Sequence, residues 1–123
     1  MTKLNKPSSI ATVSDLLQVI SPGPCLEILL AIGEGEACVC HLEASLGYRQ
    51  AYISQHLMSL REAGLLSTRR DGKYIFYRLE RPEIMEMVEL AARLAGFDAF
   101  VVAGRVNLAR SSCDCPNCSM EKE

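Results

Sequence analysis

The chain has 123 residues and lacks any apolar run as long as the ~18 residues that a membrane-spanning helix requires. Lys3 and Lys6 near its start are not followed by an apolar stretch with a small-residue cleavage site, so this region does not resemble a signal peptide. We therefore expect a single-domain cytoplasmic protein that is not associated with a membrane.

An excess of positive charge is also lacking, because the net charge is −2. Taken alone, this value argues against a nucleic-acid-binding protein. Residues 47–81, however, hold seven basic residues against three acidic ones, a net charge of +4, which leaves −6 for the rest of the chain. One basic segment in an acidic protein is typical of a phosphate-binding face, although a solvated surface without a partner would have the same composition.

Cysteine, by contrast, is plentiful, with six residues in two groups and one outlier: Cys38 and Cys40; Cys113, Cys115 and Cys118; and Cys25. Thiols usually stay reduced in the cytoplasm. The cysteine content therefore favours metal or redox chemistry over a disulfide scaffold.

Periodicity and turn residues predict a mainly α-helical fold with one β-hairpin. The expected helices are Ile10–Ile20, about Pro24–Gly33, Val39–Leu46, Arg49–Ala63 and residues 82–95. The expected strands, Leu65–Arg70 and Lys73–Leu79, are joined by an Asp71-Gly72 turn. This order predicts a winged helix-turn-helix domain over residues 10–110, between a flexible N-terminus (1–9) and a cysteine-rich tail (111–123).

The segment Glu27–Leu79 resembles the ArsR/SmtB family of metal-responsive repressors. The resemblance depends on Ile53-Ser54-Gln55-His56-Leu57, on Leu60-Arg61-Glu62-Ala63-Gly64-Leu65 and on the wing from Asp71-Gly72-Lys73 to Tyr77-Arg78-Leu79. It implies a DNA-binding transcriptional repressor rather than an enzyme. Cys38-Val39-Cys40 resembles the thiolate pair that the arsenic, cadmium and lead sensors of this family carry on the same helix.

The sequence departs from the family pattern in two places. Those sensors usually have an acidic residue after the second cysteine, where this chain has His41. The zinc and nickel sensors have histidine-containing pairs on the C-terminal helix, but this chain has no histidine after His56. A zinc site of that type is therefore not expected, and Glu83, Glu86 and Glu89 are interpreted as a solvated helix face.

Residues at the start of a recognition helix reach base edges, whereas the wing holds phosphates. Arg49 is a candidate for guanine, and Gln50 or Gln55 for adenine. Tyr52 and Ser54 are placed for sugar, phosphate or methyl contacts. The expected phosphate contacts come from Arg69, Arg70, Lys73 and Arg78. Twofold dimers contact two half-sites, and the apolar stripes Ile10–Ile20 and Ile84–Leu94 predict a homodimer through the N- and C-terminal helices.

The spacing of Cys38 and Cys40 constrains where an ion can bind. Positions i and i+2 of a regular helix point about 200° apart, so these thiols can share an ion only if Cys38 lies at or before the N-cap, or if the first turn distorts. The positive end of the helix dipole favours thiolate at this position.

The tail thiols Cys113, Cys115 and Cys118 are expected to complete a site with Cys38 and Cys40, within one protomer or across the dimer. Three thiolates suit As(III) or Pb(II), and four suit Cd(II) or Zn(II). Cys25 is more often a small core residue and is kept as a minor candidate ligand. Ion binding is expected to shift the positioning helix and release the operator, with a coupling of ~3 kcal/mol, or about a hundredfold in affinity.

Three other interpretations remain open. The same fold could sense oxidants or reactive sulfur through its cysteines. Cys115-Pro116-Asn117-Cys118 resembles glutaredoxin-type motifs, which would indicate a thiol-disulfide enzyme, but it lacks the strand-helix context that such motifs have. The chain could also be a metal-buffering or protein-interaction module that no longer binds DNA.

Overall fold

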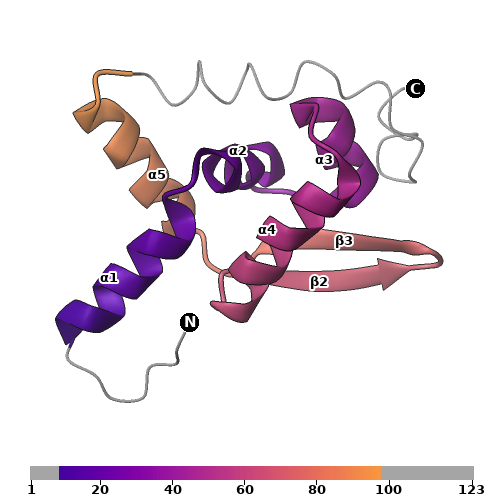
Figure 1. The fold of residues 1–123 in the computed structure, drawn as a ribbon, viewed down its shortest axis with the longest axis horizontal. Helices are drawn as coiled ribbons and strands as arrows, with labels where there is room; N and C mark the ends of the chain where they lie inside the picture. Colours follow the sequence, from indigo (N-terminus) through magenta and orange to yellow (C-terminus); the bar gives the residue numbers. More distant parts are fainter. Residues whose placement is uncertain (1–8, 98–123) are drawn as a thin grey trace.

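The computed structural model describes residues 9–97, so most of the predicted flexible N-terminus and the cysteine-rich tail lie outside the described residues. Within the described range the helices are α1 (Ser9–Ile20), α2 (Gly23–Ile32), α3 (Val39–Leu46), α4 (Gln50–Glu62) and α5 (Glu83–Leu94). The strands are β1 (Ala37–Cys38), β2 (Leu66–Asp71) and β3 (Tyr74–Leu79). Figure 1 shows the β2–β3 wing extending from one end of the molecule, with α1 and α5 at the other end. The predicted winged helix-turn-helix architecture is confirmed.

Local sequence explains where the two helices of the helix-turn-helix motif meet. α3 ends at Gly47, whose φ of 80° lies in the left-handed region that glycine adopts without a steric penalty. Arg49, extended at φ −70° and ψ 154°, then forms the N-cap of α4. The recognition helix thus begins one residue later than predicted and ends at Glu62.

The sheet contains a strand that the sequence did not predict. β1 pairs antiparallel with β3, which gives the strand order β1-β3-β2. Ala37 lies opposite Tyr77, and Cys38 lies opposite Phe76. A two-residue strand has no periodicity of its own to detect, and its existence depends on β3 being brought alongside it. As a result, the predicted thiol site adjoins the wing as well as the positioning helix.

The hairpin turn lies one residue later than predicted. Asp71 is the last residue of β2 and pairs with Tyr74, so Gly72 and Lys73 form the loop. Gly72 has a φ of 63°, and a glycine with positive φ at the first loop position is typical of a type II′ turn. The predicted Asp71-Gly72 turn was therefore wrong, because it placed the glycine second.

The core lies between α2, α4 and the inner face of the sheet. Ile28, Leu29, Leu42, Ile53, Leu57 and Leu60 are fully buried. Ile84 and Val88 attach α5 to this core, while Glu83, Glu86 and Glu89 are exposed, as expected for a solvated helix face. No single helix within residues 9–97 is long and apolar enough to cross a membrane; α1 and α2 meet that criterion only as a pair bent by 80°.

Candidate nucleic-acid interface and thiol site

The outer face of α4 presents most of the residues that the sequence predicted to read bases. Ile53, Leu57 and Leu60 fix the inner face of the helix in the core. The opposite face consequently exposes Arg49, Gln50, Tyr52 and Gln55, with Ser54 half-buried at its edge. A long polar face at the start of a recognition helix is suited to major-groove contacts.

Tyr52 is held on this face by aromatic neighbours. Its ring centroid lies 5.1 Å from that of Tyr48 and 4.7 Å from the imidazole of His56, which it meets edge to face. The Tyr48 hydroxyl donates a 2.6 Å hydrogen bond to Oε1 of Glu27 on α2, and this bond, together with partial burial, raises the pKa of Tyr48 to about 12. The contacts tie the start of the recognition helix to α2 and orient Tyr52.

The four basic residues predicted on the wing differ in their surroundings. Arg70 and Lys73 are exposed near the tip, where Arg70 Nε donates to the Gly72 carbonyl at 3.3 Å and Lys73 Nζ lies 5.6 Å from the Tyr74 ring centroid. Arg78 lines a hollow that is also lined by four acidic residues, Glu34, Glu36, Glu86 and Glu89. These carboxylates repel phosphate, so the surroundings favour Arg70 and Lys73 for backbone contacts.

Arg69 makes a contact that sequence reasoning missed. Its guanidinium forms a forked pair with Glu36, from Nε to Oε2 at 2.8 Å and from Nη2 to Oε1 at 2.7 Å. The hydrogen bond to Glu36, which opposes partial desolvation, raises the pKa of Arg69. The two residues are 33 positions apart, and no local pattern in the sequence indicates this pairing. A phosphate contact by Arg69 would have to compete with this carboxylate.

The thiols of Cys38 and Cys40 are brought together at the start of α3. Cys38 is the N-cap residue, with an extended backbone at φ −92° and ψ 170°. This is the geometry that the i, i+2 spacing requires, and it places the two sulfurs 3.4 Å apart. The backbone N–H of His41 donates to the Cys38 sulfur over 3.4 Å, which is the N-cap hydrogen bond of α3.

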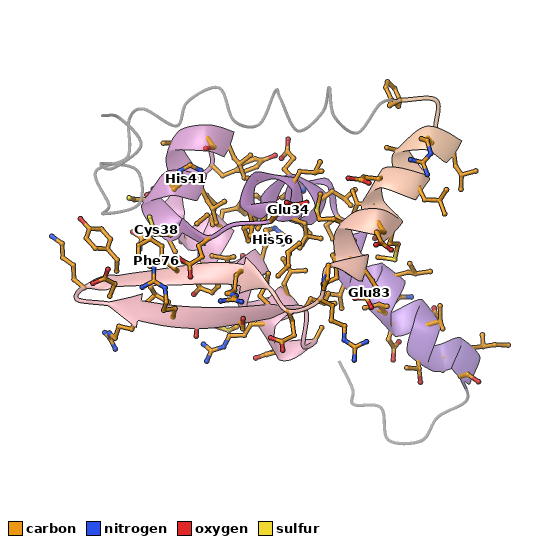
Figure 2. The ribbon with its side chains drawn as sticks, turned by 180° about the vertical axis from the view of Figure 1, so that it is seen from behind. Glu34, Cys38, His41, His56, Phe76 and Glu83 are labelled. Carbon is orange, nitrogen blue, oxygen red and sulfur yellow. The ribbon has the colours of Figure 1, made fainter. Side chains whose placement is uncertain are left out.

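The thiol pair lies against the wing. Cys38 and Phe76 form a small buried cluster of their own, with Cys40 and Tyr74 packed against it. Figure 2 shows Cys38 beside Phe76, where α3 meets the hairpin. The guanidinium carbon of Arg69 lies 4.7 Å from the centroid of the Phe76 ring. The contact of Phe76 with the thiol site follows from β1, which pairs Cys38 with Phe76.

Cys25 lies in a different environment from the other two thiols. It is 1% exposed, in the main core, and its sulfur lies 3.3 Å from Nδ1 of His56. Burial raises the pKa of Cys25, which disfavours its thiolate form. Within residues 9–97, the Nε2 of His56 is buried without a hydrogen-bond partner. The structure therefore supports the interpretation of Cys25 as a core residue, and the side chain of His56 contacts its sulfur.

An apolar surface remains on the helices at the end opposite the wing. On α1, Ile10 is 81% exposed and Leu17 is 48% exposed; on α5, Leu94 is 82% exposed. A hollow runs along α1 and is lined by Ile10, Val13 and Leu17 with four polar residues. Exposed apolar side chains concentrated on two helices are typical of a protein–protein contact.

Known proteins are similar to this chain in sequence and in fold. The profile described as "Bacterial regulatory protein, arsR family" matches residues 26–68. The arsenic resistance transcriptional regulator ArsR1 of Pseudomonas putida is 49% identical over 61 residues, which cover 50% of this chain and 47% of that protein. The chain thus spans about half the length of this relative. The biofilm growth-associated repressor of Xylella fastidiosa is 36% identical over 88 residues, 72% of this chain and 77% of the repressor.

One solved structure matches this chain over most of its own length. Reduced HlyU from Vibrio cholerae superposes with a TM-score of 0.65 at 34% identity, covering 72% of this chain and 93% of HlyU. The fold, the extent of the sequence matches and the exposed polar face of α4 all indicate the same family of regulators. This protein belongs to the ArsR/SmtB family of bacterial transcriptional regulators.

Proposed function

We propose that the protein is a cytoplasmic repressor that binds operator DNA as a homodimer and releases it when a thiophilic ion binds at Cys38 and Cys40. One observation carries this proposal: the two sulfurs lie 3.4 Å apart on the residue that caps the positioning helix and on that helix's first turn. A ligand there contacts the element that fixes the recognition helix. The name of the arsenic resistance relative makes As(III) the first ion to test.

The separation of the sulfurs supports As(III) over larger ions. Tetrahedral zinc, with Zn–S bonds of about 2.3 Å, needs sulfurs about 3.8 Å apart, and Cd(II) and Pb(II) form longer bonds still. The 3.4 Å separation suits a small pyramidal centre with narrower angles. No group of three or more candidate ligands occurs among residues 9–97. We therefore propose that Cys113, Cys115 or Cys118, all outside the described residues, supplies the third thiolate from the same or the partner protomer.

The test is a titration of the complex between the full-length protein and its upstream operator. Fluorescence anisotropy should show that As(III) lowers operator affinity about a hundredfold, which is an ordinary allosteric coupling. Cd(II) and Pb(II) should act more weakly, and Zn(II) least. Unchanged affinity with all four ions would refute ion-controlled release.

The exposed wing residues offer a separate test of DNA binding. Arg70→Ala and Lys73→Ala should each weaken operator and non-operator DNA alike, because phosphate contacts carry no sequence information. Each substitution should also reduce the slope of log affinity against log salt by about 1. Gln50→Ala should instead reduce the preference for the operator. If the wing variants leave the salt slope unchanged, the wing does not hold phosphate.

A redox input to the same fold is the second candidate. The similar HlyU structure is described as reduced, and two sulfurs 3.4 Å apart need little movement to form a link. Mass spectrometry after treatment with peroxide or persulfide, alongside operator binding, separates the two inputs. Release that coincides with loss of two hydrogens or gain of sulfur, without any ion, would favour redox control.

A further inference from the structure

We infer that Phe76 and the Glu36–Arg69 ion pair transmit the state of the Cys38/Cys40 site to the wing, which is repositioned when the thiols bind their ligand. This inference rests on the proposed function and names the route by which that site is regulated. The route through the positioning helix to α4, expected from sequence, bypasses the wing. The two routes therefore differ in which residues should uncouple ion binding from DNA release.

The backbone provides the first link. Cys38 is in β1 and lies directly opposite Phe76 in β3. Phe76 lies in turn opposite Arg69 in β2, so the thiol strand and both wing strands share one antiparallel register. No loop separates the thiol from the wing. A shift of Cys38 therefore acts on β3 through ladder hydrogen bonds, which do not stretch freely.

The side chains provide the second link. Phe76 is fully buried and Cys38 is 2% exposed, in contact within one small cluster. Close-packed side chains resist a change of shape, so an ion bound beside the two sulfurs adds volume next to Phe76 and displaces the ring or the strand that carries it. Phe76 is the bulkiest member of the cluster, and its own strand leads directly to the wing tip.

The Glu36–Arg69 pair provides the third link, because it fastens the outer strand to the thiol segment. Glu36 precedes β1 and lies two residues before Cys38, while Arg69 is in β2 and covers the Phe76 ring at 4.7 Å. The pair is forked, with bonds of 2.7 and 2.8 Å, and a forked pair tolerates little relative movement of its two partners. It therefore favours the arrangement of wing and thiols seen here.

Movement of the wing changes the positions of the basic residues that we propose to contact DNA. Arg70 is the neighbour of Arg69 in β2, and Lys73 lies in the loop that joins the two wing strands. Repositioning Phe76 and opening the ion pair change where these cations lie relative to α4. Phosphate and base contacts must be made together for full affinity, so a displaced wing weakens operator binding without any change in the recognition helix.

The experiment compares Glu36→Gln with Glu34→Gln in the full-length protein. Both variants remove one carboxylate from the same loop, but Glu34 is exposed and forms no ion pair in the described part of the chain. Glu36 is chosen over Arg69 because Arg69 is itself a candidate DNA contact. The measured quantity is the ratio of operator affinities without and with saturating As(III), which cancels any effect of charge on DNA binding alone.

Glu36→Gln should reduce this ratio roughly tenfold, within the range that a residue on a coupling route produces, while Glu34→Gln should leave it unchanged. As(III) affinity in the absence of DNA should change less than about threefold in both variants. By reciprocity, the coupling lost in Glu36→Gln then appears as tighter As(III) binding by the DNA-bound form. Phe76→Leu keeps an apolar side chain in the cluster and should reduce the ratio similarly. Melting curves show whether Phe76→Leu folds, and Glu36→Gln does not alter the core.

The outcomes separate the two proposals. If the wild type is not released by As(III), the proposed function fails and the inference with it. If the wild type is released and Glu36→Gln and Phe76→Leu retain its full ratio, only the inference is overturned, and the route runs through α3 and α4. If Glu34→Gln reduces the ratio as much as Glu36→Gln, the effect is one of loop charge and the inference is likewise overturned.

Discussion

Cys38→Ser is expected to abolish As(III)-induced release while leaving the ion-free operator complex intact. The ratio of operator affinities without and with As(III) should fall from about a hundred to about one, because a hydroxyl does not replace a thiolate for a soft ion. The fold should be retained, since Cys38 is the N-cap of α3 and serine is among the best N-cap residues. Cys40→Ser should have the same effect. Fluorescence anisotropy measures the release, and the ultraviolet absorption of sulfur–arsenic bonds measures ion binding directly.

Cys25 provides the matched control. Cys25→Ala also removes one thiol, but that thiol is buried, contacts His56, and has a pKa raised by burial. The variant should therefore melt at a lower temperature than the wild type but respond normally to As(III). Loss of the response in Cys25→Ala, or its persistence in Cys38→Ser, would contradict the assignment of the site.

Truncation before Cys113 tests the contribution of the tail. If a tail thiolate completes the site, the truncated protein should bind As(III) much more weakly, because two thiolates remain where three are needed. Mixing the truncated protein with Cys38→Ser then distinguishes the two arrangements. A heterodimer that regains one working site indicates that thiolates from both protomers meet. A normal response by the truncated homodimer would refute the shared site.

Leu17→Glu is expected to break the dimer and with it operator binding. Leu17 is 48% exposed on α1, so glutamate is tolerated in the folded protomer but not in an apolar contact between protomers. A twofold interface contains each substitution twice, which increases the penalty. We expect the dimer dissociation constant to rise at least a hundredfold, or about 3 kcal/mol, with a comparable loss of operator affinity. Sedimentation velocity measures the first quantity and anisotropy the second.

Met58→Glu is the control for oligomeric state. Met58 is 60% exposed on α4, which is not one of the two helices that carry the apolar surface, so this variant should stay dimeric. If Leu17→Glu also stays dimeric at micromolar concentration and binds the operator normally, the dimer surface lies elsewhere. Leu94→Glu, on α5, then shows whether the C-terminal helix alone provides the contact.

The sequence predicted elements whose signals are local. Helical spacing of apolar residues located all five helices to within a residue or two. The segment that resembles the ArsR/SmtB family identified the helix-turn-helix motif. The spacing of Cys38 and Cys40 required an extended backbone at Cys38 if both thiols were to bind one ion, and the structure has this backbone. The hairpin was expected, but its turn was placed one residue early because the strongest dipeptide signal does not determine which loop position the glycine takes.

Other features depend on contacts between distant segments. β1 exists only because β3 lies beside it, and a strand of two residues has no pattern to read. The pairs Glu36–Arg69 and Cys25–His56 join residues 33 and 31 positions apart. In each case the sequence shows only a charged residue in a loop or a cysteine on an apolar helix face. Each partner is set by how the helices pack on the sheet.

The sequence by itself thus determined the class of fold and the family, because hydrophobic period, turn glycines and short motifs act over a few residues. It also predicted a thiol site at Cys38 and Cys40. Only the tertiary structure decided what the thiols contact. It placed Cys38 and Cys40 against Phe76 of the wing and separated them from Cys25 in the core. The physical reason is that the pairing of β1 with β3 joins segments far apart in the sequence, and no local rule encodes which strands meet.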